Sequence, residues 1–143
     1  MSAVSDANLD IVRQILDRWS EGDFSVAEGE LDPHVVLVLR PEFPDAGAYV
    51  GLEGMGRYTR GFLEPWTRIT IEAVELIPAG DSVVARVLQR GVGESSGAPA
   101  EFRYFQVWTL RGGRVIRLEM VREREEALEA VGVTPQAGPG RAQ

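Results

Sequence analysis

Hydrophobic residues in the first half of the chain switch between helical and extended spacing. Over residues 8–19 they recur every three or four positions, which predicts an amphipathic helix. A short second helix is expected over residues 24–31, and the apolar run at 35–39 predicts a strand buried on both faces. Residues 41–51 are rich in turn formers and predict a loop, after which residues 52–63 return to helical spacing.

Extended segments joined by turns dominate the second half. Strands are expected at residues 68–77, 82–92, 101–110 and 114–122. A closing helix is expected over 123–131, and residues 134–143, rich in Pro, Gly and Ala, are expected to be a disordered tail. This order predicts one α+β domain over residues 1–133, in which a curved antiparallel sheet wraps around helices and encloses an apolar pocket.

Side-chain parity predicts which residues of the last three strands face the helices. Successive residues of a strand point to opposite faces, so alternate positions share one face. The inward set is expected to be Val83, Ala85, Val87, Gln89, Phe102, Tyr104, Gln106, Trp108, Leu110, Ile116, Leu118 and Met120. For the last two strands to pair in this register, residues 111–113 must form a three-residue loop with a glycine bulge.

The opposite face of these strands mixes arginines with apolar residues and predicts contact with a second subunit. The residues expected to make this contact are Arg86, Arg103, Phe105, Arg117 and Glu119. Glu119 is expected to join a cross-strand charge ladder with the neighbouring arginines. We therefore expect a homodimer formed through the outer sheet face.

The composition excludes several kinds of chemistry. The chain has no cysteine and one histidine, and all 15 of its basic residues are arginine, which excludes thiol nucleophiles, Schiff-base lysines and multi-histidine zinc sites within one chain. No metal or cofactor is expected. The net charge of −7 argues against nucleic acid as a partner, and no apolar run is long enough to span a bilayer. With no signal sequence at its start, the chain is expected to be cytoplasmic.

Several short motifs add a family resemblance. They are Trp-Ser-Glu-Gly-Asp at 19–23, Gly-Leu-Glu-Gly at 51–54, Ser-Gly at 96–97, the hairpin sequence at 110–115 and the closing segment at 124–132. Together with the element order, they make residues 8–133 resemble the nuclear transport factor 2-like superfamily, in particular its SnoaL-like branch. The resemblance implies a cone-shaped, cystatin-like fold around an apolar pocket. It also implies kinship with ketosteroid isomerases, polyketide cyclases and limonene epoxide hydrolases, which often form dimers.

The catalytic residues of these relatives are not reproduced. Limonene epoxide hydrolases carry an arginine and an aspartate two apart on one strand and an aspartate on the last strand, whereas ketosteroid isomerases use a tyrosine and two aspartates. The corresponding positions here are Val87, Gln89 and Met120 for the first set, and Ile15, Leu39 or Arg40, and Gln106 for the second. The resemblance therefore implies a pocket without a complete catalytic set.

The expected pocket is lined mainly by aromatic and apolar side chains, which suit a small hydrophobic molecule. Its expected lining residues are Trp19, Tyr58, Phe62, Trp66, Val87, Gln89, Tyr104, Gln106, Trp108, Leu118 and Met120. An ordinary core role also explains most of the aromatic residues in this set. The favoured function is the binding of a small hydrophobic molecule.

Two alternatives stay open. An acid–base enzyme acting on a hydrophobic substrate, such as an isomerase, cyclase or dehydratase, needs an ionisable group, and the candidates are Tyr58, His34, Arg40, Asp45 and Tyr104. His34, Arg40 and Asp45 also fit the pattern of ordinary exposed side chains. The other alternative is a dimeric interaction module whose interior is only a filled core.

Overall fold

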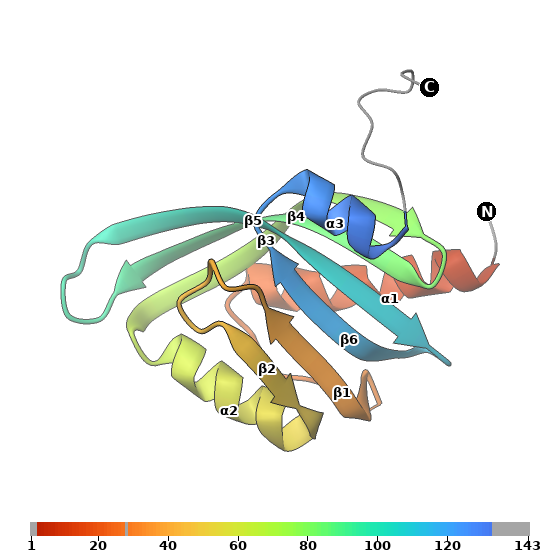
Figure 1. Cartoon of the computed structure of the whole chain (residues 1–143). Coiled ribbons are helices and arrows are strands. Elements are labelled where there is room, and N and C mark those ends of the chain that lie inside the picture. Colours follow the sequence, from red (N-terminus) through yellow and green to blue (C-terminus); the bar gives the residue numbers. More distant parts are fainter. Residues whose placement is uncertain (1–2, 28, 133–143) are drawn as a thin grey trace.

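The computed structural model describes residues 3–27 and 29–132, which form three helices and a six-stranded sheet (Figure 1). In chain order the elements are α1 (Ala3–Ser20), β1 (Leu31–Leu39), β2 (Gly47–Val50), α2 (Gly51–Leu63), β3 (Trp66–Ala79), β4 (Ser82–Gly93), β5 (Pro99–Arg111), β6 (Arg114–Val121) and α3 (Arg124–Ala130). The α+β architecture expected from the sequence is confirmed. The expected tail at 134–143 lies outside the described residues.

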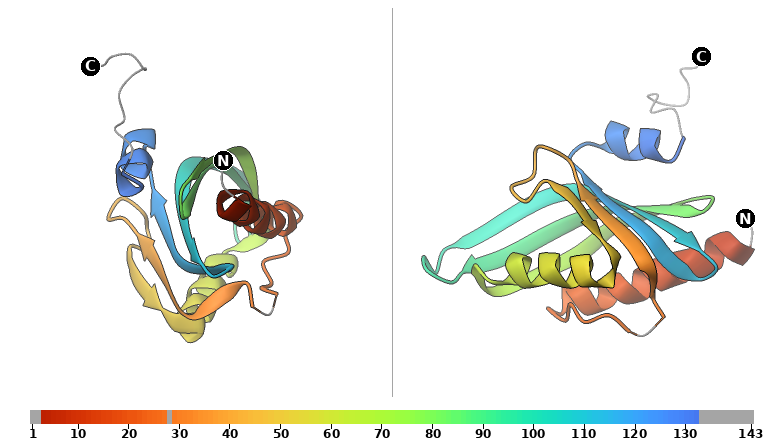
Figure 2. Two further views of the ribbon diagram at one scale, coloured as in Figure 1. Left: turned by 90° about the vertical axis from the view of Figure 1, so that its right-hand side faces the viewer. Right: turned by 60° about the horizontal axis from the view of Figure 1, so that its bottom comes forward.

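The strands follow the order β2-β1-β6-β5-β4-β3 in a curved sheet that does not close on itself. All neighbouring pairs are antiparallel except β1 and β6, which run parallel. Figure 2 shows α1 on one side of the sheet and α3 on the other. The sheet thus separates an inner layer, which α1 and α2 cover, from an outer layer that α3 partly covers.

The main core lies between the concave face of the sheet and the two longer helices. Val12, Ile15 and Leu16 of α1 form one buried stripe, which produces the helical spacing seen in the sequence. Opposite them, Trp108 of β5 is only 1% exposed. Since each fully buried Leu, Val or Ile side chain contributes roughly 1.5–3 kcal/mol, this layer holds the helices on the sheet.

The expected parity of β4 and β5 is confirmed. The main core takes Val83, Ala85, Val87, Tyr104, Trp108 and Leu110, all from the predicted inward set. A second cluster on the outer face consists of Val84, Phe105, Val107, Val121 and Ala127. Ala127 belongs to α3, so this short helix buries the centre of the outer face.

Charged contacts hold α3 in place over the sheet. Arg124 donates to Glu75 of β3 at 2.9 Å, and its guanidinium lies 5.3 Å from the centre of the Phe105 ring. Arg86 of β4 donates to the same Glu75 carboxylate at 3.2 Å. These hydrogen bonds, that of Arg124 first and then that of Arg86, hold the pKa of the Glu75 carboxyl below its usual value.

The second helix expected over 24–31 is wrong. Described residues of this segment are coil and turn, and β1 already begins at Leu31. Side chains replace the helical hydrogen bonds here, since Asp23 accepts bonds from the Ser25 backbone and hydroxyl, and Glu30 accepts one from the Ala27 backbone. Such local side-chain bonds stabilise a turn in competition with a helix.

The strand expected to be buried on both faces is buried on one only. Val35, Leu37 and Leu39 are buried, whereas Val36 and Val38 between them are half-buried. The loop expected at 41–51 also contains β2, whose four residues pair with the end of β1. Val36 and Val38 lie on the outer face of the sheet, where α3 packs mainly on β5 and β6 and leaves β1 less covered.

The hairpin between β5 and β6 turns on two residues, not on the three expected. Gly112 and Gly113 both have positive φ angles, of 60° and 79°, and Arg111 pairs directly with Arg114. Two positive φ angles are what a two-residue hairpin turn of type I′ requires. The extra residue needed to restore parity appears at Ile116, where the register shifts. Val115 therefore enters the main core in the position expected for Ile116.

Candidate functional site

A cavity of about 740 Å³ opens at the end of the sheet where β3–β6 pass beneath α2 and the loop at 40–46. Its lining residues are Leu39, Glu42, Phe43, Pro44, Asp45, Tyr58, Gly61, Phe62, Pro65, Trp66, Gln89, Glu101, Phe102, Arg103, Tyr104, Met120 and Arg122. Aromatic and apolar side chains form its walls, and most of its charged groups come from the loop and the strand ends. The cavity is of the size that drug-sized ligands occupy.

Ring contacts fix the aromatic wall. Tyr58 stacks on Phe62 with 5.8 Å between ring centres, and Tyr49 meets Tyr58 edge-on at 5.1 Å. Phe43 of the loop at 40–46 meets the Tyr104 ring edge-on at 5.5 Å. These distances and tilts are the ones that aromatic pairs prefer. All three tyrosines of the chain are therefore gathered at this end of the molecule.

Gly91 of β4 allows Trp66 to form the opposite wall. A Cβ atom at position 91 would lie 2.6 Å from Cε3 of the Trp66 ring, closer than real Cβ contacts allow. Only glycine gives the ring room to lie against the strand. Trp66 then packs on Phe102 of β5, with 6.4 Å between ring centres.

Tyr104 and Gln89 form the polar pair of the cavity wall. The Tyr104 hydroxyl donates to Gln89 Oε1 at 2.8 Å, and the two residues are 7% and 8% exposed. Burial, and then the neighbouring Tyr58, raise the pKa of the Tyr104 hydroxyl, while the nearby Gln106 amide opposes the shift. Tyr104 therefore stays protonated near neutral pH and acts as a hydrogen-bond donor.

Tyr58 also keeps its proton. Burial raises the pKa of its hydroxyl well above the usual value, and the negative charge of Asp45 and the neighbouring Tyr49 raise it further. Asp45 stands on the loop before β2 and lines the same cavity. A protonated phenol thus lies close to a carboxylate on one side of the cavity.

The interior beyond this cavity is filled. Gln106 is fully buried, and its Oε1 accepts a hydrogen bond from Trp108 Nε1 at 3.0 Å. Its Nε2 makes no hydrogen bond of normal geometry to the described residues, although it lies close enough to Tyr104 to affect that hydroxyl. Two further voids, of about 10 and 40 Å³, lie beside Trp19. The open space is therefore confined mainly to one end of the cone.

A model of the SnoaL-like domain family matches residues 12–118, three quarters of the chain. The chain belongs to the SnoaL-like domain family. An NTF2-like protein of unknown function from Burkholderia pseudomallei is similar in structure, with a TM-score of 0.71 and 18% identity over 93% of this chain and 100% of that one. A putative SnoaL-like polyketide cyclase from Jannaschia sp. CCS1 has a TM-score of 0.71 and 17% identity over 94% and 98% of the two chains.

TerC, crystallised with polyporic acid, has a TM-score of 0.69 and 18% identity over 87% of this SnoaL-like chain and 98% of its own. At these identities the structural matches establish the fold, which is the cone-shaped fold expected from the sequence. No curated protein matches the sequence. The activity must therefore be argued from the site itself.

In this SnoaL-like domain, the residues expected to line the pocket lie in two places. Those at the cavity are Tyr58, Phe62, Trp66, Gln89, Tyr104 and Met120. Those deeper in the core are Trp19, Val87, Gln106, Trp108 and Leu118, of which Trp19, Trp108 and Leu118 border the small voids. Parity identifies the inner face of a strand. The position of a cavity along that face depends on where the helices and loops pack against the sheet.

Only three of the five ionisable candidates reach the cavity, namely Tyr58, Asp45 and Tyr104. His34 is exposed near the start of β1, where its backbone N–H donates to Asp32 Oδ1 at 2.8 Å. The placement of Arg40 at the pocket mouth is wrong. Its Nε donates to Glu119 Oε2 at 2.6 Å on the outer side of the sheet, which raises the pKa of the guanidinium.

The main partner of Glu119 is therefore Arg40, and not the arginines of the cross-strand ladder expected from the sequence. Its side chain is 10% exposed and lies beneath Arg40, with Arg117 Nη2 at 3.4 Å from Oε1. Phe105 is also buried, beneath α3. Arg86 pairs with Glu75, whereas Arg103 and Arg117 remain exposed. Dimerisation through this face stays a prediction, with a smaller sheet surface available for it than the sequence indicates.

Two of the cavity residues that the sequence reasoning missed come from the loop at 40–46. Phe43 and Pro44 line the cavity, and neither belongs to a predicted strand or helix. An apolar Phe43-Pro44 pair in an otherwise polar loop is the signal that points to them. Such a pair in a loop needs a hydrophobic surface to cover.

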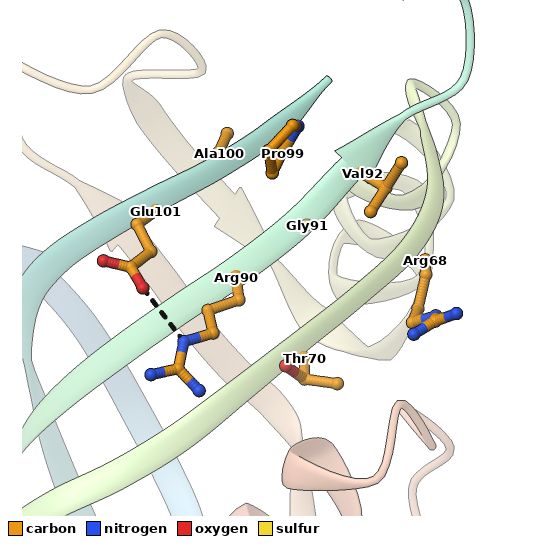
Figure 3. A pocket seen from close by; sticks show the side chains of 8 residues that line it. All are labelled: Arg68, Thr70, Arg90, Gly91, Val92, Pro99, Ala100 and Glu101. Atoms are coloured by element: carbon orange, nitrogen blue, oxygen red, sulfur yellow. Dashed lines mark hydrogen bonds and ion pairs between the residues drawn. The ribbon is translucent and has the colours of Figure 1, made fainter. Parts of the chain in front are cut away.

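A shallower depression of about 440 Å³ lies on the outer face of β3–β5, and Figure 3 shows its lining side chains. Arg90 donates to Glu101 at 3.0 Å across the two strands, and Arg68 and Thr70 border them. Within the described part of the chain, no group of three potential metal ligands is found. No helix of that part is long and apolar enough to cross a membrane.

Proposed function

We propose that this SnoaL-like domain binds a small hydrophobic molecule in the cavity between α2 and the ends of β3–β6. The observation that carries the proposal is the cavity of about 740 Å³, walled by aromatic rings around the hydrogen-bonded Tyr104–Gln89 pair. The aromatic and apolar walls of the cavity face solvent, and covering such surface with a hydrophobic ligand is favourable.

The polar groups in the buried part of the cavity favour ligand binding over acid–base catalysis. Tyr104 donates to Gln89, and Gln89 can turn its amide N–H groups towards a ligand. Neither group can take up a proton near neutral pH. TerC, which shares the fold, was crystallised with polyporic acid, an organic molecule, and this is consistent with a ligand in such a cavity.

Acid–base catalysis is the second candidate function, and Asp45 is the observation that favours it. Its carboxylate lines the cavity near the protonated Tyr58, so a base and a hydrogen-bond donor share one site. An isomerisation, cyclisation or dehydration needs such a pair. In an active enzyme, Asp45→Asn lowers turnover at least about a hundredfold, as expected on loss of a general base.

The binding proposal is tested with N-phenyl-1-naphthylamine, an uncharged dye whose fluorescence rises in apolar surroundings. Gly61 of α2 lines the cavity, and a Cβ atom added there meets nothing within 4 Å. Gly61→Leu therefore places a side chain at the cavity without a clash. We expect dye affinity to fall about tenfold, which corresponds to roughly 1.4 kcal/mol of lost binding.

The matched control is Gly56→Leu. Gly56 lies in the same helix, does not line the cavity, and its added Cβ makes only ordinary contact with Arg60 at 3.5 Å. Both variants remove a helical glycine and so affect α2 propensity alike. Loss of dye binding in the first variant alone supports the proposal. Equal binding by both variants, or none by the wild type, counts against it.

A further inference from the structure

We propose that the ligand of this cavity is an organic ammonium cation with a hydrophobic body. The inference rests on the proposed function and adds the charge of the molecule that the site selects. It is motivated by two features that a site for a purely neutral molecule does not need. One is the excess of aromatic faces over aliphatic side chains in the wall, and the other is an unpaired carboxylate beside those faces.

The aromatic wall provides the first argument. The rings that line the cavity are Phe43, Tyr58, Phe62, Trp66, Phe102 and Tyr104, whereas Leu39 and Met120 are the larger aliphatic-type side chains among its lining residues. The face of an aromatic ring carries partial negative charge and attracts a cation placed within about 6 Å of its centre. The attraction of several such rings offsets the cost of removing an ammonium group from water, as aromatic cages for quaternary ammonium ligands show.

The second argument is the carboxylate of Asp45. Among the described residues, this carboxylate has no ion-pair partner within 4.0 Å and no side-chain hydrogen bond, since the Tyr49 hydroxyl donates to the Asp45 backbone carbonyl instead. It is close enough to Tyr58 to act on that hydroxyl by its charge. A cation held against the Tyr58 ring therefore lies within reach of a counter-ion.

The remaining charges of the rim do not reverse this preference. Arg103 Nη1 lies 3.4 Å from Glu101 Oε1, and Arg90 donates to the other oxygen of that carboxylate. Glu42, on the same loop as Asp45, adds a second acid, and Arg122 is the base that opposes the two. Glu101 is therefore paired with two arginines, and the loop at 40–46 adds two acids, Glu42 and Asp45, on a chain whose net charge is −7. This field raises the local concentration of cations.

The test compares two probes of the same shape. Phenyltrimethylammonium is a cation, and tert-butylbenzene is its uncharged isostere. Binding of each is followed by amide chemical-shift changes of the isotope-labelled protein. We expect the cation to bind about tenfold more tightly than the isostere, the difference that one or two desolvated cation–ring contacts produce.

Four variants separate the two sources of this preference. Asp45→Asn removes the counter-ion, and Asp17→Asn, on the exposed side of α1, makes the same change in net charge away from the cavity. Tyr58→Leu removes a ring, and Tyr58→Phe keeps it. We expect Asp45→Asn and Tyr58→Leu each to reduce the preference about threefold or more, and the other two variants to keep it.

The outcomes distinguish this inference from the function beneath it. Equal affinity of the two probes for the wild type overturns the cation preference and leaves the hydrophobic cavity site standing. A preference that Asp17→Asn lowers as much as Asp45→Asn overturns the inference as well, because it then reflects overall charge. Binding of neither probe, together with no binding of the naphthylamine dye, overturns the proposed function itself.

Discussion

Replacing Tyr104 by Phe removes one hydroxyl from the cavity wall and keeps the ring against Phe43. The hydroxyl donates to Gln89 Oε1 at 2.8 Å, and Gln89 is 8% exposed, so the substitution leaves a nearly buried acceptor without its partner. A net hydrogen bond contributes about 0.5–1.5 kcal/mol, and an unsatisfied buried group costs about 1–3 kcal/mol. Because Gln89 borders the cavity, solvent can reach it, and we expect a loss near the lower end of the second range, about 1 kcal/mol.

A double-mutant cycle isolates this interaction. Gln89→Leu alone leaves the Tyr104 hydroxyl without its acceptor, whereas the double variant leaves two apolar side chains in contact. We expect the double variant to be more stable than the sum of the single losses by about 1 kcal/mol. Urea unfolding followed by tryptophan fluorescence gives the free energies, provided that the denaturant slope is unchanged. Additivity of the two single effects within about 0.3 kcal/mol refutes the reasoning.

Three further outcomes are expected. The pKa of Glu75 is lowered in the folded state, so its contribution to stability is present above the unfolded value of 4.5 and is lost as the pH falls through the folded pKa. Between pH 5 and 3 the wild type should therefore lose more unfolding free energy than Glu75→Gln does. Equal losses in the two proteins would contradict this. Arg40→Leu leaves the Glu119 carboxylate, 10% exposed, with one weaker partner, and should cost about 2 kcal/mol in urea unfolding at pH 7, most of it recovered by adding Glu119→Gln. Gly91→Ala forces the Trp66 ring away from β4 and should cost about 1–3 kcal/mol, with a shift in tryptophan emission; unchanged stability and emission would contradict that contact.

The sequence was sufficient to predict the elements whose hydrophobic residues follow one regular spacing. Helical spacing gave α1 and α2, and the alternation in β4 and β5 placed Tyr104 and Trp108 inward because a strand has only two faces. It failed where side chains compete with backbone periodicity, as around Asp23, whose carboxylate stabilises a turn in place of a helix. It also failed at Ile116, because the location of a bulge depends on how two strands pair.

The cavity could be predicted by residue type but not by position. Parity assigned Gln106 and Gln89 to the same inner face, yet Gln106 is sealed in the core and Gln89 borders the open space. The difference arises from the loop at 40–46 and from α2, which meet the sheet at one end only. No local pattern records where separate elements meet. Arg40 illustrates the same limit, because its partner Glu119 is distant in the sequence and adjacent in the sheet.

The parallel pairing of β1 with β6 has a consequence for biosynthesis. Met120 of β6 pairs with Leu39 of β1, although the two strands lie at opposite ends of the chain. During synthesis, the edge of β1 that pairs with β6 has no partner strand until β6 has left the ribosome. Contacts between distant segments slow folding, because a long loop must close before they form. The part of the cavity that Leu39 and Met120 line is therefore among the last parts of the molecule to form. A nascent chain stalled before β6 exposes the edge of β1.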